Sequence, residues 1–380
     1  MSSFLFKLTF LLLWMGLSAL VTLFLYSSQK KYYTKLILPN PSNPKELIDV
    51  HKKYDVFSRN DKPETFLKLF ISVVFLFWIR FIFALILSSS LMIILLYKYS
   101  HLKQKNFISK EERSSFKFFI NLLTKYFLLS SGILSYHHRL KKEDVEKIYK
   151  KYFGEDYEIE YESKYCCFIS NHISFIDILL AMTYYGTGFM SKESVKNAPI
   201  IGTICDSLQS LYVDRESIKN RQLMFEKLEE RLKNFYNDKI FTPIMIFPEG
   251  TTTSNRHILK FKRGAFASLL PIKPMMVKGN FNNNFHIGCG NSDVFINYLR
   301  GYTKLFSYVE YIELPIMKPT DFMYEKYKDL GKEKWEIFAE VAREIYCEIG
   351  GFQKSDMTLK DTQNYTKIMK TGKYCENKQI

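Results

Sequence analysis

The chain has 380 residues, enough for one large domain with additional elements or for two domains. Its 54 Lys and Arg outnumber its 39 Asp and Glu, and the net charge of +15 favours an anionic partner: nucleic acid, a phosphate-bearing substrate or a membrane surface. An AT-rich genome would also enrich Lys. The cations are scattered and no reading helix stands out, which argues against nucleic acid. The six cysteines form no CxxC pair and no Cys/His cluster at zinc spacing, so we expect no metal site and a reducing compartment.

The first apolar segment covers residues 8–26 and is nearly free of charge. It is long enough to cross a bilayer as a helix. A cleaved signal peptide is the rival interpretation, but the segment exceeds a typical signal core and no small-x-small cleavage site follows. We therefore expect residues 1–30 to be a transmembrane anchor, followed by a basic loop over residues 31–66.

The second membrane segment is expected over residues 67–97, where Lys68 and Arg80 interrupt an apolar run. Residues 81–97 could span alone, with residues 69–79 along the interface and Arg80 reaching the headgroups. A bent hairpin that returns to the same face is the alternative. Lys and Arg are frequent on both sides of the segment, and the positive-inside rule therefore favours the hairpin.

An amphipathic, interfacial linker is expected over residues 98–140. Within it, residues 115–135 are apolar with few charges. This pattern predicts a helix that lies on the bilayer or docks on the domain, and a core helix is the alternative.

A domain is expected over residues 141–350, because short apolar runs there alternate with helix-length amphipathic stretches. The expected strands are 165–170, 188–192, 210–214, 243–247, 271–277 and 307–314, and the expected helices begin at Ser174 or cover 215–236 and about 333–349. Such alternation predicts an α/β fold with a mostly parallel sheet flanked by helices, preceded here by N-terminal membrane helices. Residues 351–380 are polar and are expected to form a loose tail.

His172 and Asp177 stand where a predicted strand gives way to a helix, within the stretch SNHISFIDILL. Ser174 is a good helix N-cap and Asp177 follows three residues later, so a capping box explains Asp177 without any function. The same geometry lets Asp177 accept a hydrogen bond from one ring nitrogen of His172. The other nitrogen would then be an unprotonated base, and a substrate hydroxyl would supply the nucleophile.

A second candidate site lies in residues 245–266, MIFPEGTTTSNRHILKFKRGAF. Pro248 and Gly250 mark a tight turn after a strand, and Glu249 is an acidic residue in that turn. Thr251 offers a hydroxyl, and Lys262 lies in a cluster of cations. A strand, a tight turn, hydroxyls and cations together suit a phosphate site, and a solvated basic turn is the alternative.

Arg215 stands at a third strand-to-helix junction, in LYVDRES. It could clamp a phosphate through two nitrogens, or it could pair with Asp214 or Glu216 on a helix surface.

These three motifs carry a resemblance to a known family. NHISFID, VDRE and FPEGTTT, in this order and at these separations, resemble the glycerophospholipid acyltransferases, which include lysophosphatidic acid and lysophosphatidylcholine acyltransferases. The resemblance spans roughly residues 120–350. It implies that an acyl chain moves from acyl-CoA to a lipid hydroxyl, with His172 as general base and Asp177 orienting it.

The resemblance also implies substrate-binding residues. Arg215, Glu249 and Gly250 match the positions that hold the acceptor's phosphate and shape its pocket, and Thr251 and Lys262 fall in matching loops. Acyl-CoA is implied as co-substrate, with no cofactor, no metal and no covalent intermediate. The implied partners are acyl-CoA, the lysophospholipid acceptor and membrane lipids.

The acceptor class rests on one departure from the family pattern. Members that form phosphatidic acid usually carry an arginine directly after Glu-Gly-Thr, where this chain has Thr252. This resembles the lysophosphatidylcholine and lysophosphatidylethanolamine group, and glycerol-3-phosphate or lysophosphatidic acid acyltransferase is the alternative. A hydrolase would need a nucleophile motif, and no G-x-S-x-G is present. A non-catalytic membrane lipid-binding protein is the alternative of another class. The family and the anchor together place the protein in the endoplasmic reticulum membrane, with its catalytic domain facing the cytosol.

Overall fold

The computed structural model describes residues 2–37, 53–57, 64–102, 109–198, 201–213, 218–238, 241–280 and 294–371. Within them a seven-stranded sheet has the order β1-β8-β7-β2-β5-β3-β4. The strands are β1 (Ile133–Arg139), β2 (Phe168–Ser170), β3 (Gly188–Lys192), β4 (Leu211–Val213), β5 (Ile244–Ile246), β7 (Lys273–Asn280) and β8 (Ser307–Glu313). Neighbouring strands are parallel except β7 and β8, which are antiparallel. The predicted α/β class with a mostly parallel sheet is confirmed, and each predicted strand overlaps an observed one.

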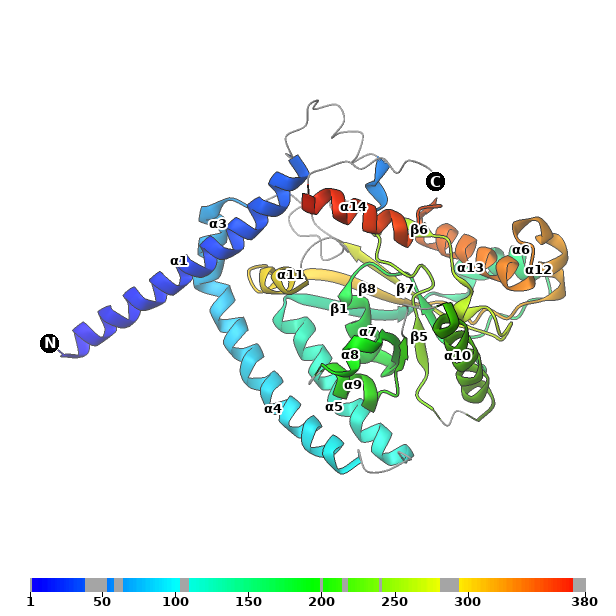
Figure 1. Cartoon of the computed structure of the whole chain (residues 1–380), viewed down its shortest axis with the longest axis horizontal. Coiled ribbons are helices and arrows are strands. Elements are labelled where there is room, and N and C mark those ends of the chain that lie inside the picture. Colours follow the sequence, from blue (N-terminus) through cyan, green and yellow to red (C-terminus); the bar gives the residue numbers. More distant parts are fainter. Residues whose placement is uncertain are drawn as a thin grey trace.

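Helices cover both faces of the sheet (Figure 1). On one face α5 (Lys110–Ser130) and α7 (Phe175–Tyr185) pack against Val277 and Tyr311. On the other, α6 (Lys142–Phe153), α10 (Ile218–Asp238) and α13 (Lys334–Gly350) pack against their neighbours Met276 and Ile312. This alternation is that of a sheet buried on both sides. Four further helices follow β1 in the chain: α8 (Glu193–Lys196), α9 (Ile201–Ser207), α11 (Val294–Gly301) and α12 (Asp321–Lys326).

Strand β1 lies inside residues 98–140, which were predicted to form a linker, so the last part of that range belongs to the sheet instead. It pairs only with β8, at the edge of the sheet, and most of its side chains are half-buried or exposed. An edge strand of this kind lacks the continuous apolar run that identified the central strands, which explains why the sequence pattern did not reveal it.

Two helical stretches are long and apolar enough to cross a membrane, Phe6–Gln29 and Phe66–Lys98. The first lies within α1 (Ser2–Ile37). The second is continuous: α3 (Phe66–Ser72), a π-helical stretch (Val73–Phe77) and α4 (Trp78–Leu102) follow one another without a turn. The hairpin favoured by the loop charges is therefore wrong, because a hairpin needs a turn between two helices.

Arg80, expected to reach the headgroups, instead binds the domain. Its guanidinium donates to the backbone carbonyl oxygens of Lys304 and Leu305, the latter at 2.6 Å. These two acceptors satisfy the cation within the protein, although they lie far from it in sequence.

Helix α4 is held against α5 along much of its length. The ring centroids of Phe83 and Tyr126 are 5.2 Å apart near one end, and near the other the Lys98 ammonium donates to the Ser115 hydroxyl at 2.8 Å. On the side of α4 away from this contact, large apolar side chains such as Ile86 are exposed. Helix α5, in turn, docks on α7, which agrees with the core-helix alternative for one of its faces.

The prediction of a loose tail over residues 351–380 is wrong for residues 351–371, and residues 372–380 lie outside the described residues. Residues Gln353–Ser355 form β9, which pairs in parallel with β6 (His257–Leu259), and α14 (Leu359–Thr371) follows. Tyr365 is fully buried and Ile368 nearly so. Their spacing of three residues is one stripe of a helix, a short signal that the polar composition around it masks.

Candidate functional site

His172 and Asp177 are brought together between the end of β2 and the start of α7. The carboxylate oxygen Oδ2 of Asp177 lies 2.8 Å from His172 Nδ1. The same oxygen accepts from the backbone N–H of Ile173 at 2.6 Å and of Ser174 at 2.9 Å, and the Ser174 hydroxyl caps α7. The capping box and the His–Asp pair are therefore one structure: the contacts that begin the helix also hold the acidic partner of the histidine.

The ring of His172 is oriented so that one of its nitrogens can accept a proton. With Nδ1–H donating to Asp177, the lone pair is on Nε2. The side chain is 17% exposed, and its ring stacks on Phe247 with centroids 4.1 Å apart and planes at 15°. Phe247 follows β5 directly and was not singled out from the sequence, because an aromatic residue at a strand end usually reads as core. Its stacking fixes the plane of the imidazole.

Asn171 secures the end of β2 beside the histidine. Its amide accepts from the backbone N–H of Val277 at 2.8 Å and donates to the carbonyl oxygen of the same residue at 3.0 Å. This two-way bond ties β2 to β7 just after their last paired residues. The backbone on one side of His172 is thus fixed by the sheet.

Glu249 fixes the backbone of His172 itself. Its Oε1 accepts from the His172 backbone N–H at 2.9 Å, and its Oε2 accepts from the Leu259 backbone N–H at 2.9 Å. The residue is only 1% exposed. Burial, helped by the nearby charge of Asp177, raises the pKa of Glu249 to about 8, against the two N–H donors and Arg343, which lower it. The carboxyl group therefore joins the histidine to the β6 region rather than facing a ligand.

The proton on Glu249 predicts a pH effect on stability. Between its ordinary pKa of 4.5 and about 8, the folded protein keeps a proton that the unfolded chain has lost. The contribution of Glu249 to stability is therefore complete below pH 4.5 and falls by up to about 1.4 kcal/mol per pH unit until the pH passes about 8. Thermal unfolding from pH 5 to pH 8 should show this slope as a difference between the wild type and Glu249→Gln. A difference that does not change with pH would contradict the assignment.

Gly250 and Lys262 meet next to Glu249. Gly250 has φ +72°, which favours glycine, and a Cβ added there would lie 2.3 Å from the Nζ of Lys262. The bare backbone of Gly250 thus makes room for the ammonium group. Thr251 turns away toward the C-terminal helix, where its hydroxyl donates to that of Thr362 on α14 at 3.4 Å. Arg215 lies outside the described residues, and its phosphate role stays a prediction.

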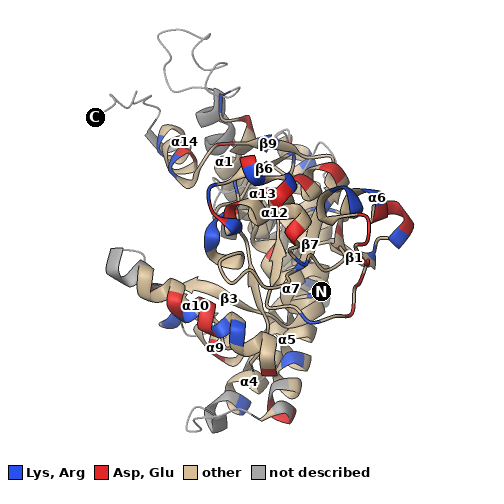
Figure 2. Ribbon diagram, turned by 90° about the vertical axis from the view of Figure 1, so that its right-hand side faces the viewer, with Lys and Arg blue, Asp and Glu red and all other residues tan. Residues whose placement is uncertain are grey.

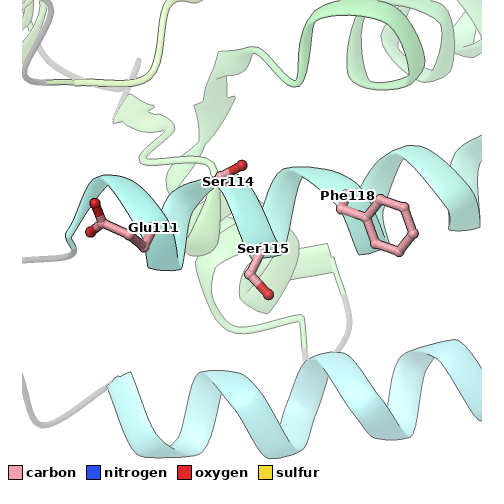
Figure 3. A pocket seen from close by; sticks show the side chains of 4 residues that line it. All are labelled: Glu111, Ser114, Ser115 and Phe118. Carbon is pink, nitrogen blue, oxygen red and sulfur yellow. The ribbon is translucent and has the colours of Figure 1, made fainter.

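Charges of both signs and a further hollow are found elsewhere among the described residues. Lys and Arg alternate with Asp and Glu along α6 and α10 (Figure 2). A hollow of about 530 Å³ on α5, shown in Figure 3, is lined by Glu111, Ser114, Ser115 and Phe118, none of which belongs to the motifs above. Within the described residues, no group of three or more His, Cys, Asp or Glu is arranged to hold a metal ion.

Comparisons with known proteins find similarity to acyltransferases. A family model described as "Acyltransferase" matches residues 140–278. The lysophospholipid acyltransferase LPEAT1 of Arabidopsis thaliana is 29% identical over 198 residues, covering 52% of this chain and 48% of that protein. The lysophosphatidylcholine acyltransferase of Drosophila melanogaster is 24% identical over 194 residues, covering 51% of this chain and 34% of that protein. This chain thus spans half or less of the length of these relatives.

One solved structure is also similar. It is the 1-acyl-sn-glycerophosphate acyltransferase PlsC of Thermotoga maritima, with a TM-score of 0.40 and 16% identity, over 72% of this chain and 97% of that one.

Proposed function

Since this chain belongs to the glycerophospholipid acyltransferases, we propose that it moves a fatty acyl chain from acyl-CoA to the free hydroxyl of a lysophospholipid. The observation that carries the proposal is the His172–Asp177 pair at 2.8 Å, with Nε2 of the histidine left to act as a base. The names of the relatives support a lysophospholipid acceptor, as does Thr252 in place of the arginine typical of phosphatidic-acid-forming members. Glycerol-3-phosphate or lysophosphatidic acid is the alternative acceptor.

The proposed reaction needs one base and no enzyme-bound acyl group. Nε2 of His172 takes the proton of the acceptor hydroxyl while the oxygen attacks the thioester carbonyl, and Asp177 stabilises the imidazolium that forms. When the tetrahedral intermediate collapses, the carbon–sulfur bond breaks and the CoA sulfur takes the proton back from Nε2. The products are the acylated lipid and CoA, and His172 returns to its neutral form.

The proposed location is a membrane, the endoplasmic reticulum, with the catalytic domain on the cytosolic side. The exposed apolar side chains of α1 and α4 support membrane attachment. Cys166, Cys167, Cys205 and Cys347 are free thiols, in keeping with a reducing compartment. The lysophospholipid and membrane lipids are the partners that this placement supplies.

The test is release of CoA from oleoyl-CoA by the detergent-solubilised protein, with lysophosphatidylcholine, lysophosphatidylethanolamine, lysophosphatidic acid and glycerol-3-phosphate offered in turn. We expect release that depends on one of the two zwitterionic lysophospholipids. Preference for lysophosphatidic acid or glycerol-3-phosphate would select the alternative acceptor. Folded protein that binds lysophospholipid but releases no CoA with any acceptor would overturn the proposal in favour of a lipid-binding protein.

A further inference from the structure

Two segments from opposite ends of the chain meet beside the catalytic loop. One is Lys53–Phe57, which contains the short helix η1 (Asp55–Phe57) and lies in sequence between the two apolar helices; the other is α14. Figure 1 shows η1, in blue, against α14, in red. They share a small apolar cluster, separate from both faces of the main sheet: Tyr54, Val56, Phe57, Leu259, Tyr365 and Ile368. We call the two segments together the clamp.

Stacked aromatic rings hold the two halves of the clamp together. The ring centroids of Tyr54 and Tyr365 are 5.2 Å apart, with planes at 24°. Tyr365 is fully buried, although α14 is otherwise a polar helix. The two buried apolar side chains among the described residues of α14, Tyr365 and Ile368, both belong to this cluster.

Polar contacts fasten the clamp to the loop that follows Glu249. The backbone N–H of Ser254 donates to the carbonyl oxygen of Val56 at 2.7 Å, and Arg256 pairs with Asp55 at 2.6 Å. On the α14 side, Thr251 reaches Thr362, as described above. Residues 251–256 are therefore held from both halves of the clamp.

One chain of contacts runs from the clamp to the histidine. The side chain of Leu259 is in the clamp cluster, while its backbone N–H donates to Oε2 of Glu249. The other oxygen of Glu249 accepts from the backbone N–H of His172. A second link is parallel to it: the backbone N–H of Thr253 donates to the carbonyl oxygen of His172 at 2.8 Å.

We propose that the clamp positions the catalytic histidine, with Tyr54 and Tyr365 acting as positioning residues through Leu259 and Glu249. The inference rests on the proposed function only for the expected change in kcat; the expected change in amide exchange does not depend on it. Both backbone groups of His172 are held by residues 249–253, and the clamp covers this segment and its continuation to Leu259. Without the clamp the fold keeps its sheet and both main cores, but the loop that holds His172 loses its outer support.

One half of the clamp belongs to the part of the chain that joins the two apolar helices. Lys53–Phe57 lies between α1 and α3 in sequence, and it also contacts the catalytic loop. A cavity of about 440 Å³ lies beside the clamp, bounded by Asp55, Arg256, Gly351 and neighbouring residues. On that side the clamp borders open space, and it is held by its apolar cluster and by its polar contacts with residues 251–256.

The test compares Tyr365→Ala with Tyr365→Phe and with a matched control, Phe153→Ala. Phe153 is also a buried aromatic residue stacked on a tyrosine, with centroids 4.6 Å from Tyr157, but it belongs to the main core beneath α6. All variants are full-length and solubilised in the same detergent. Two experiments are made: steady-state kinetics, which give KM and the kcat per folded molecule, and hydrogen–deuterium exchange of the amides of His172 and Leu259.

We expect Tyr365→Ala to lower kcat at least about tenfold with little change in KM for acyl-CoA, and to speed exchange of both amides at least about tenfold. Tyr365→Phe should restore both, because it keeps the ring. Phe153→Ala should lower stability and leave kcat of the folded fraction and both amides near wild type. Unchanged exchange in folded Tyr365→Ala, or equal exchange in Phe153→Ala, would overturn the clamp. If Tyr365→Ala does not fold, Val56→Ala and Ile368→Ala take its place under the same criteria.

The exchange measurement separates the two proposals. If the wild type transfers no acyl group but Tyr365→Ala exchanges the His172 and Leu259 amides faster than the wild type, the clamp stands and the proposed function is overturned. If the wild type transfers an acyl group but exchange in Tyr365→Ala is unchanged, the proposed function stands and the clamp is overturned.

Discussion

Replacing His172 with alanine is expected to lower kcat by about 10²- to 10⁴-fold, the usual contribution of a positioned general base. The imidazole has an orienting carboxylate, Asp177 at 2.8 Å from Nδ1, and its ring is stacked in place on Phe247. Asp177→Asn should have a similarly large effect. An asparagine that donates its amide N–H toward Nδ1 would favour the tautomer with the proton on Nε2, which cannot accept the substrate's proton.

The measurement is CoA release at saturating substrates, with thermal unfolding to confirm the fold. His137→Ala is the matched control. His137 is also partly buried and hydrogen-bonded, with its Nε2 2.8 Å from the Tyr185 hydroxyl, but it lies on β1 at the edge of the sheet. It should retain wild-type kcat. More than about a tenth of wild-type kcat in a folded His172→Ala protein would show that another group takes the proton.

Glu249→Gln is expected to lower kcat about 10- to 100-fold and to destabilise the fold. The carboxyl accepts two backbone N–H groups, whereas a glutamine offers one oxygen and turns an NH₂ group toward the second donor. Leaving one buried N–H unpaired costs about 1–3 kcal/mol. The loss of kcat follows because His172 loses part of its backbone support, and displacements near 1 Å at a catalytic group can cost about 10²-fold.

Glu313→Gln provides the comparison. Glu313 is as deeply buried as Glu249, but it lies on β8, which β7 separates from β2, and it accepts from the side chains of Lys273 at 2.7 Å and Arg139 at 3.0 Å rather than from the backbone of His172. We expect it to destabilise the protein while leaving kcat of the folded fraction unchanged. Equal losses of kcat in the two variants, after correction for the folded fraction, would reduce Glu249 to a general stabilising residue.

Local sequence signals predicted the parts of the site that depend on neighbouring residues. The spacing of Ser174 and Asp177 is a helix start, and it places the carboxylate within reach of His172 whatever the rest of the chain does. The apolar runs before His172 and Glu249 predicted two strands of a mostly parallel sheet. The structure shows that these strands, β2 and β5, are neighbours, so their carboxyl ends lie at one edge of the sheet. The fold class and the His–Asp contact therefore followed from residues a few positions apart.

Contacts between distant segments were beyond this reasoning. No local pattern indicates that Arg80 binds the carbonyl groups of residues 304 and 305, or that Tyr365 stacks on Tyr54. Glu249 stood out as an acidic residue in a turn, but its two partners are set by where β6 returns to the loop. These contacts are properties of the assembled tertiary structure, and they corrected the headgroup contact of Arg80 and the loose tail.

The docking of α4 on α5 bears on how a lipid would reach the protein. Helix α4 contacts α5 near both of its ends, and Arg80 ties it to residues 304 and 305, so it stays with the domain. A bilayer that covers the exposed apolar side chains of α4 therefore also contacts the domain. Under the proposed function, the acceptor then arrives by two-dimensional diffusion within one leaflet. Its density in that leaflet, rather than its concentration in water, would set the encounter rate, and dilution with inert detergent micelles should slow the reaction even when every bulk concentration is held constant.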